Sequence, residues 1–309
     1  GRDKILARYR SYHGATYATI TLTGDPRRWG NEPGMPGVVH VLDPYHGTRR
    51  GTDDAETALA YLDETIQLEG PDSIAAFILE PVTGTNGILI PPDGYLQGVR
   101  ELCDRHGILL IADEIMSGFG RTGEWFAVNH WGVVPDILTM AKGLTSSAVP
   151  LGAVGLRPDV YRFFDDHVFW GGLTYNSHPL ALAAALATIR VYEEDGLLEH
   201  ARKMGDAMAR HHQELHEKHP SVGLVRNIGM FGILELVRSR ETMEPLAPFN
   251  GTSDEMKAIG RHLDERGLFT MVRWNGIMTN PPLCTTEEQL AEGFGIIDEA
   301  LALADAAVA

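Results

Sequence analysis

The chain has 309 residues, of which 44% are hydrophobic and 22% charged, and its formal net charge is −16. This composition is typical of a folded globular protein that is long enough for one large and one smaller domain. The negative charge argues against nucleic acid or an anionic membrane as a partner, because binding to phosphates depends on clustered Lys and Arg. No apolar run approaches the roughly 20 residues that span a bilayer.

Only two cysteines occur, Cys103 and Cys284, and they provide neither a disulfide framework nor the spacing of metal ligands. We therefore expect no bound metal and a cytoplasmic location. The chain starts with Gly1, without an initiator Met and without the apolar run of a secretory signal. We expect its natural N-terminus to lie further upstream.

Short apolar runs alternate with helical patterns in the first half of the chain. The periodicity of their apolar residues predicts helices over 57–68 and 95–106. Alternating strands and helices imply an α/β fold with a doubly wound, mainly parallel sheet. The runs expected to be buried parallel strands are residues 73–80, 107–113, 136–140 and 151–154.

Residues 179–219 are nearly all helix formers, apolar at first and then charged. We place the domain boundary there, which gives a large cofactor-binding domain of residues 1–197 and a smaller α+β domain of residues 198–309. Three histidines in the charged part are interpreted as a solvated helix face: His211, His212 and His216. The later elements expected are a strand-like region over 222–237, a helix over 253–266, a strand pair over 269–279 and a last helix over 286–306.

Three ionisable residues stand where predicted strands end. Glu80 ends one strand, Asp113 ends the next, and Lys142 follows the 136–140 strand by two residues. Ligands of open α/β sheets bind at the carboxyl ends of strands, and Gly143 permits close approach to Lys142. Each residue alone also has an ordinary interpretation, as a surface lysine or a helix cap. Together they favour covalent chemistry on a carbonyl cofactor.

The period of a strand puts Asp113 and Ile115 on one side and Glu114 on the other. An acid beside a branched apolar group suits a flat pyridinium ring, because the acid keeps the ring nitrogen protonated while the aliphatic group packs on the ring. Lys142 would form a Schiff base and later transfer protons. This role requires a lowered pKa for Lys142.

Two segments, IADEIMSGFGRTG (111–123) and PDILTMAKGL (135–144), resemble the signature of class III aminotransferases. The separation of 29 positions from Asp113 to Lys142 also fits that family. The resemblance implies fold type I, with a mainly parallel sheet flanked by helices and a smaller C-terminal domain. It also implies pyridoxal 5′-phosphate as the cofactor, with Lys142 as the Schiff-base residue and Asp113 at the ring nitrogen.

Further matches assign other residues by the same resemblance. In SYHGAT (11–16), Tyr12 is similar to the aromatic residue that stacks on the cofactor opposite Ile115, and His13 joins the same site. Thr174 is similar to a threonine that reaches the cofactor phosphate of the neighbouring subunit, which implies a homodimer or tetramer with sites at the interface. Arg273 is similar to an arginine that binds a substrate carboxylate. Each of three residues also has an ordinary alternative. Tyr12 could be a core aromatic residue, Thr174 a helix cap and Arg273 a structural arginine.

The family also places a glutamate like Glu80 beside the cofactor, although a structural role in an acid–base network is an open alternative. Relatives that use 2-oxoglutarate carry a glutamine and a switch glutamate where this chain has Thr83 and Thr85. Their absence favours pyruvate as the acceptor. The family's phosphate-cradling turn, which precedes the SYHGAT match, is missing, and we therefore expect a fragment of a longer product.

The stretch GDPRRW (24–29) resembles the taurine:pyruvate branch of the family. Arg27 and Arg28 favour a sulfonate or carboxylate at the distal end of the donor, or else form a surface loop held by Trp29. The predicted reaction is transfer of an amino group from an ω-amino acid or amine, such as taurine or β-alanine, to pyruvate. The alternatives are aminomutase or decarboxylase chemistry on the same cofactor, or an inactive truncated fragment.

Overall fold

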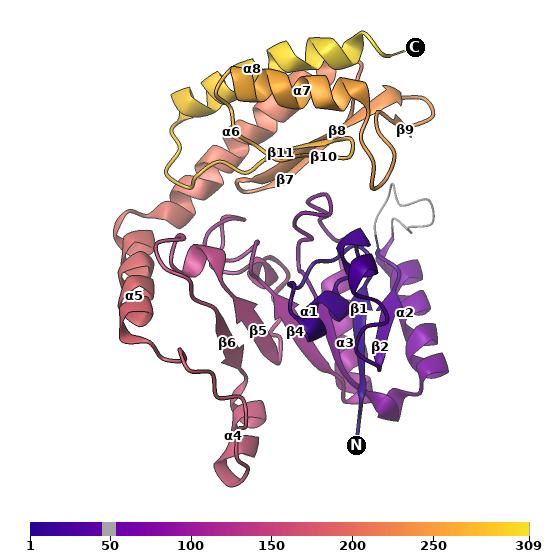
Figure 1. Cartoon of the computed structure of the whole chain (residues 1–309), viewed down its shortest axis with the longest axis vertical. Helices are drawn as coiled ribbons and strands as arrows, with labels where there is room; N and C mark the ends of the chain where they lie inside the picture. The colour runs from indigo at the N-terminus through magenta and orange to yellow at the C-terminus, as the bar shows by residue number, and fades with distance from the viewer. Residues whose placement is uncertain (45–53, 309) are drawn as a thin grey trace. The chain divides into compact units, whose positions relative to one another are not determined.

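The computed structural model describes residues 1–44 and 54–308 (Figure 1). Contacts between residues divide the chain into two compact units. Unit 1 comprises residues 1–119 and 124–195, and unit 2 comprises residues 120–123 and 196–309. In the described residues, no helix has both the length and the apolar character needed to cross a membrane. The sequence predicts a boundary between two domains at residues 197/198. This boundary stays a prediction.

Unit 1 is built on a six-stranded sheet in the order β2-β1-β3-β4-β5-β6 (Figure 1). Helices α2 and α3 pack on it and share one apolar core with β1, β3 and β4. The strands are β1 (Lys4–Arg8), β2 (Val38–Val41), β3 (Ile74–Leu79), β4 (Leu109–Asp113), β5 (Ile137–Met140) and β6 (Ala153–Leu156). The helices are α1 (Tyr17–Leu22), α2 (Ala55–Glu69), α3 (Tyr95–His106), α4 (Pro158–Asp166) and α5 (Pro179–Glu194).

Helix α3 shows how the sequence pattern produces an element of this core. Leu96, Val99 and Cys103 recur on one face, and all three are buried. The helix ends at Gly107, which adopts the left-handed conformation (φ 62°) that favours glycine at this position. The predicted α/β fold, with strands 73–80, 107–113 and 136–140 and helix 95–106, is confirmed to within two residues.

The first five strands run parallel to their neighbours, whereas β6 is antiparallel to β5. The prediction that residues 151–154 form a buried parallel strand is therefore wrong. The segment between β5 and β6 contains only a short 3₁₀ helix, Lys142–Leu144, and no crossover helix, so the chain returns in the opposite direction. Val154 and Leu156 are exposed on this edge strand.

Strands β1 and β2 were not predicted from the sequence. Both are short, and the periodicity of five or four residues is too weak to detect. In the structure Leu6 and Ala7 of β1 are fully buried. Since β2 lies on one side of β1 and β3 on the other, the sheet order reverses between β1 and β3. In open α/β sheets a ligand crevice forms at such a switch point.

Unit 2 has an antiparallel sheet in the order β10-β11-β8-β7, with β9 paired to β8. Helices α6, α7 and α8 lie on one face of it and bury a common core that includes Met208, Leu234, Ile259 and Leu301 (Figure 1). The strands are β7 (Val222–Ile228), β8 (Phe231–Ser239), β9 (Glu244–Pro245), β10 (Val272–Arg273) and β11 (Gly276–Thr279). The helices are α6 (Leu197–Lys218), α7 (Asp254–Glu265) and α8 (Glu287–Asp305).

The strand-like region 222–237 is confirmed, and it forms a hairpin that turns at Gly229, where φ is 54°. Two other expectations for this part of the chain need correction. The helical run 179–219 is two helices, because Asp195 ends α5 and Gly196, with φ 61°, precedes α6. His212 does not belong to a solvated face, since it is 1% exposed on the side of α6 that meets the sheet.

The ring of His212 packs against Phe294 and lies within hydrogen-bond distance of Thr279. Its Nε2 lies 2.9 Å from Thr279 Oγ1, and its ring meets Phe294 edge-on at 5.3 Å between centroids. Burial lowers the pKa of His212 to about 4. The folded protein therefore keeps His212 neutral at pH values where the unfolded chain already binds a proton.

We expect the free energy of unfolding to fall as the pH falls from 6.5 towards 4, because the unfolded state binds more protons at His212 in that window. His212 should contribute roughly 1–2 kcal/mol to the loss between pH 6.5 and 5. Urea unfolding of wild type and His212→Gln at pH 7 and pH 5 measures this. The variant should lose less stability between the two pH values, while His216→Gln should behave like wild type. Equal losses in wild type and His212→Gln would contradict the assignment.

Candidate active site

The carboxyl ends of β1, β3, β4 and β5 lie next to one another in the sheet. The segments that leave these ends carry Tyr12, Glu80, Asp113 and Lys142, in that order across the sheet. The parallel pairing of the four strands therefore brings together residues that are up to 130 positions apart in the sequence. This is the edge at which the sequence predicts the site.

Asp113 is a buried carboxylate, 5% exposed, with both oxygens oriented. Its Oδ2 lies 2.7 Å from His13 Nδ1, and its Oδ1 accepts a hydrogen bond from the backbone N–H of Ile115 at 3.1 Å. His13 is itself held through its backbone N–H, which donates to Thr23 Oγ1 at 3.0 Å. Asp113 is thus fixed at the end of β4 rather than free to rotate.

Glu80 joins the segment after β1 to the segment after β3. Its Oε1 accepts from the backbone N–H of Tyr12 at 3.0 Å, and its Oε2 accepts from the backbone N–H of Gly84 at 2.7 Å. Burial raises the pKa of Glu80, and Asp113 adds to the rise, whereas His13 and the two backbone hydrogen bonds act against it. These contacts support the structural role left open for Glu80; direct contact with a cofactor stays a prediction.

The backbone at Lys142 is strained and tightly held. Its φ of 37° lies in the left-handed region, which non-glycine residues rarely adopt. The next residue, Gly143, accepts a hydrogen bond from Tyr192 Oη at 3.0 Å through its carbonyl oxygen. A Cβ at Gly143 would come within 2.7 Å of the Phe119 Cβ, so only glycine fits. These contacts determine where the Lys142 side chain leaves the backbone.

The surrounding protein removes part of the hydration of the Lys142 amine and so lowers its pKa, although the residue is exposed. The carboxylates of Asp113 and Glu80 raise the pKa, and the guanidinium of Arg27 lowers it further. The net direction is downward. This is the direction that covalent chemistry by a lysine requires, because only the neutral amine is nucleophilic.

Glu114, predicted to lie opposite Asp113, is fully buried and bonded within the protein. Its Oε2 accepts from Ser117 Oγ at 2.5 Å and its Oε1 from the backbone N–H of Val128 at 2.9 Å. Burial raises the pKa of Glu114. These bonds make Glu114 a structural carboxylate that anchors the loop after β4.

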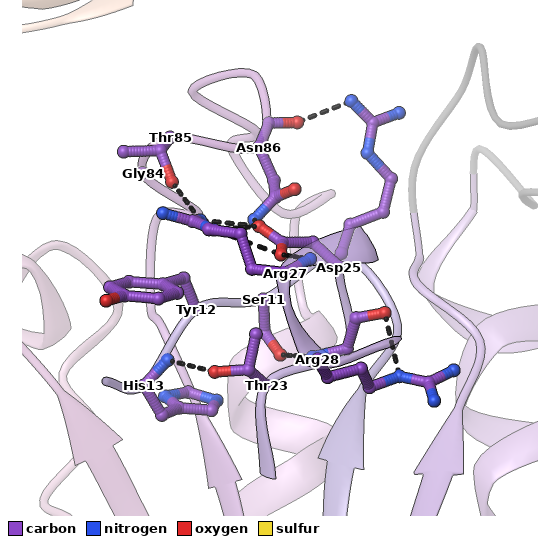
Figure 2. A network of polar contacts seen from close by, with 12 residues as sticks. Ser11, Tyr12, His13, Thr23, Asp25, Arg27, Arg28, Gly84, Thr85 and Asn86 are labelled. Carbon is purple, nitrogen blue, oxygen red and sulfur yellow. Dashed lines mark hydrogen bonds and ion pairs between the residues drawn. The ribbon is translucent and has the colours of Figure 1, made fainter. Parts of the chain in front are cut away.

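A second polar network lies over Tyr12, in the segment between α1 and β2 (Figure 2). Arg27 binds the carboxylate of Asp25 through Nε and Nη2, and its Cζ lies 3.6 Å from the centroid of the Tyr12 ring. Trp29 is 55% exposed and is not what holds this loop. The sequence analysis did not identify Asp25, although the Asp-Pro that opens the 3₁₀ helix Pro26–Asn31 is a recognisable capping signal.

Arg8 was also missed, because its strand β1 was not predicted. It is fully buried and its Nη2 donates to Thr83 Oγ1 at 3.1 Å and to the carbonyl oxygen of Glu80. Thr83 and Thr85 therefore have different surroundings. Thr83 belongs to the buried network of Arg8, whereas Thr85 Oγ1 accepts from Arg27 Nη2 at 2.8 Å.

Thr174 and Arg273 belong to segments of the chain other than the strand ends just described. Thr174 is exposed in a turn between α4 and α5. Arg273 belongs to β10 of unit 2, where its guanidinium Cζ lies 4.5 Å from the ring centroid of Trp274. The cofactor and substrate roles expected for these two residues stay predictions.

The sequence profile described as "Aminotransferase class-III" matches residues 1–301. The chain belongs to the class III aminotransferase family. Among curated relatives, the "Uncharacterized aminotransferase YhxA" of Bacillus subtilis is 38% identical over 94% of this chain and 66% of its own length. The "Taurine--pyruvate aminotransferase" of Bilophila wadsworthia is 36% identical over 96% of this chain and 68% of its own length.

Solved structures of transaminases share the fold. The taurine:2-oxoglutarate aminotransferase of Bifidobacterium kashiwanohense, solved in complex with PLP and glutamate, matches with a TM-score of 0.95 and 42% identity. That match covers 99% of this class III chain and 70% of the solved chain. Three of the curated relatives are matched over only 64 to 66% of their length.

Proposed function

We propose that this protein binds pyridoxal 5′-phosphate at the strand ends of unit 1 and transfers an amino group from an ω-amino acid or amine to a keto acid. The observation that carries the proposal is the arrangement around Lys142. A lysine with a lowered pKa, held on a strained backbone, shares the sheet edge with the oriented carboxylate of Asp113. Family membership supports the same chemistry.

The residues at this edge fit the cofactor. Asp113 presents a buried carboxylate that suits a protonated ring nitrogen, and Tyr12 and Ile115 would pack against the ring. His13 keeps unused hydrogen-bonding capacity, because its buried Nε2 has no partner in residues 1–44 and 54–308. When bound, pyridoxal phosphate supplies an aldehyde that captures amines and a ring that stabilises negative charge on the substrate carbon.

Each residue then has a distinct task. Lys142 Nζ would hold the cofactor through its aldehyde group, and its amine, when free, would move a proton at the substrate carbon. Asp113 would keep the proton on the ring nitrogen, and His13 fixes the orientation of Asp113. Glu80 positions Tyr12 through its backbone N–H. Arg273 binds the carboxylate of the keto acid.

For the substrates, we infer taurine or β-alanine as the donor class and pyruvate as the acceptor. The relative from Bilophila wadsworthia is named for taurine and pyruvate. Thr85, which stands in place of a switch glutamate, bonds to Arg27 and offers no carboxylate. The name of the Bifidobacterium structure contains 2-oxoglutarate, so that keto acid is the alternative acceptor.

A second copy of the chain would complete the site. Thr174 is flanked by exposed apolar side chains, including Trp170 at 90%, Leu173 at 75% and Tyr175 at 79% exposure. Such a cluster is typical of an interface between subunits. We infer that Thr174 reaches the cofactor phosphate of the partner subunit in a homodimer or tetramer.

Borohydride reduction of the cofactor-loaded protein, followed by peptide mass spectrometry, tests the covalent site. We expect the label on the peptide that contains Lys142 and none on Lys142→Ala, with activity in that variant lower on the order of 10⁴-fold. Lys257→Ala, an exposed lysine of α7, serves as the matched control and should keep the label. A label that persists in Lys142→Ala would refute the assignment.

The ratio of keto acid consumed to amine converted, measured on the same purified protein, distinguishes the alternative functions. Transamination consumes one keto acid for each amine converted, whereas an aminomutase or a decarboxylase does not. A protein that takes up no label at all would support the inactive fragment instead.

The oligomeric state tests the role of the Thr174 segment. Light scattering of the wild-type protein should give at least twice the 33.9 kDa of one chain. The double variant Trp170→Asp, Leu173→Asp should shift towards the monomer, because a buried carboxylate without a partner opposes association. Leu68→Asp, at an equally exposed position of α2, should leave the mass unchanged. A monomeric wild type would rule out the shared site.

A further inference from the structure

Arg27 is held in one orientation by three neighbours (Figure 2). Its Nε donates to Asp25 Oδ1 at 3.0 Å and its Nη2 donates to Thr85 Oγ1 at 2.8 Å. Its guanidinium also lies over the ring of Tyr12, 3.6 Å from the centroid. A flat cation stacked on an aromatic face and bound along one edge loses little further entropy when it binds a ligand.

The partner of Arg27 is itself buried and bonded. Asp25 is 1% exposed and accepts from Asn86 Nδ2 at 3.1 Å and from the backbone N–H of Arg27 at 2.9 Å. Burial raises the pKa of Asp25, but the hydrogen bonds and charge of Arg27 outweigh it, and the net direction is downward. The two charges form a dipole, with the negative end inside the protein and the positive end at the guanidinium.

One nitrogen of the guanidinium stays available. Nη1 makes no hydrogen bond to any atom in residues 1–44 and 54–308, while Nε and Nη2 donate to Asp25 and Thr85. The Arg27 side chain is 34% exposed, so solutes have access to it. The charged N–H groups of Nη1 can donate to an oxygen of a carboxylate or sulfonate.

The position of Arg27 relates Nη1 to the candidate active site. Arg27 stacks on Tyr12, and its charge is close enough to lower the pKa of Lys142. The neighbouring Arg28 is instead paired with Glu32, and it donates to the carbonyl oxygen of Gly24 at 3.3 Å.

We propose that Arg27 binds the distal acidic group of the amino donor and so selects ω-amino carboxylates and ω-amino sulfonates over amines that lack an acidic group. The proposal rests on the proposed transaminase function. It assigns the anion site to Arg27 alone and excludes Arg28, although the two are adjacent in sequence. Thr85 and Asp25 are positioning residues that keep Nη1 of Arg27 in place.

The donor half-reaction tests this without the acceptor. The rate at which the absorption of the bound cofactor changes is measured against the concentration of β-alanine, of taurine and of propylamine, which lacks the acidic group. In Arg27→Met the half-saturating concentrations of β-alanine and taurine should rise about 10- to 100-fold. The value for propylamine should change less than about threefold, because it makes no bond to Arg27.

Two further variants complete the test. Arg28→Met is the matched control and should keep wild-type values for all three donors. Arg27→Lys retains the charge but not the planar fork, and should lie between wild type and Arg27→Met for β-alanine. Far-ultraviolet circular dichroism and cofactor absorption show whether each variant folds and binds the cofactor.

Two results would overturn the proposal. An equal loss for propylamine and β-alanine in Arg27→Met would mean that Arg27 only supports Tyr12, and an equal effect of Arg28→Met would mean a diffuse effect of charge. If the wild type converts none of the donors, the proposed function fails by itself. In that case the dissociation constants of propionate and ethanesulfonate test Arg27 separately. The proposal requires that Arg27→Met raise both constants about 10-fold or more.

Discussion

The site depends first on the buried carboxylate of Glu80. Its two oxygens bind the backbone N–H groups of Tyr12 and Gly84, so one side chain connects the segments that follow β1 and β3. Both segments supply contacts to Arg27, since Tyr12 lies under its guanidinium and Thr85, next to Gly84, accepts from Nη2. Loss of the Glu80 carboxylate would leave the buried N–H of Gly84 and the partly buried N–H of Tyr12 without this partner, at a cost in free energy.

Charge is balanced closely around this edge of the sheet. Asp113 and Glu80 raise the pKa of Lys142, while loss of hydration and the charge of Arg27 lower it, and the net direction is downward. Asp25 pairs with Arg27 from the protein side. The proposed roles of Lys142 as a neutral amine and of Arg27 as a cation are thus compatible with one another.

The sequence predicted the parts of this site that are encoded locally. Glu80, Asp113 and Lys142 follow apolar runs long enough to be identified as strands, and the order of parallel strands brings their ends together. The orientation of Arg27 could not be predicted, because it depends on Thr85, 58 residues further along the chain.

Other features of the fold could not be predicted from the sequence for similar physical reasons. Strands β1 and β2 are too short to show a period, and the direction of β6 depends on the connection before it rather than on its own residues. The burial of His212 follows from which face of α6 meets the sheet, and the mixed charged pattern of that helix concealed this.

The central claim is that the surroundings of Lys142 prepare its amine for covalent chemistry. Competitive labelling of the cofactor-free protein with an amine reagent, read by mass spectrometry across a pH series, measures the pKa of each lysine. Lys142 should titrate below the value of about 10.4 that is usual for lysine. A pKa for Lys142 equal to or above that value would contradict the account.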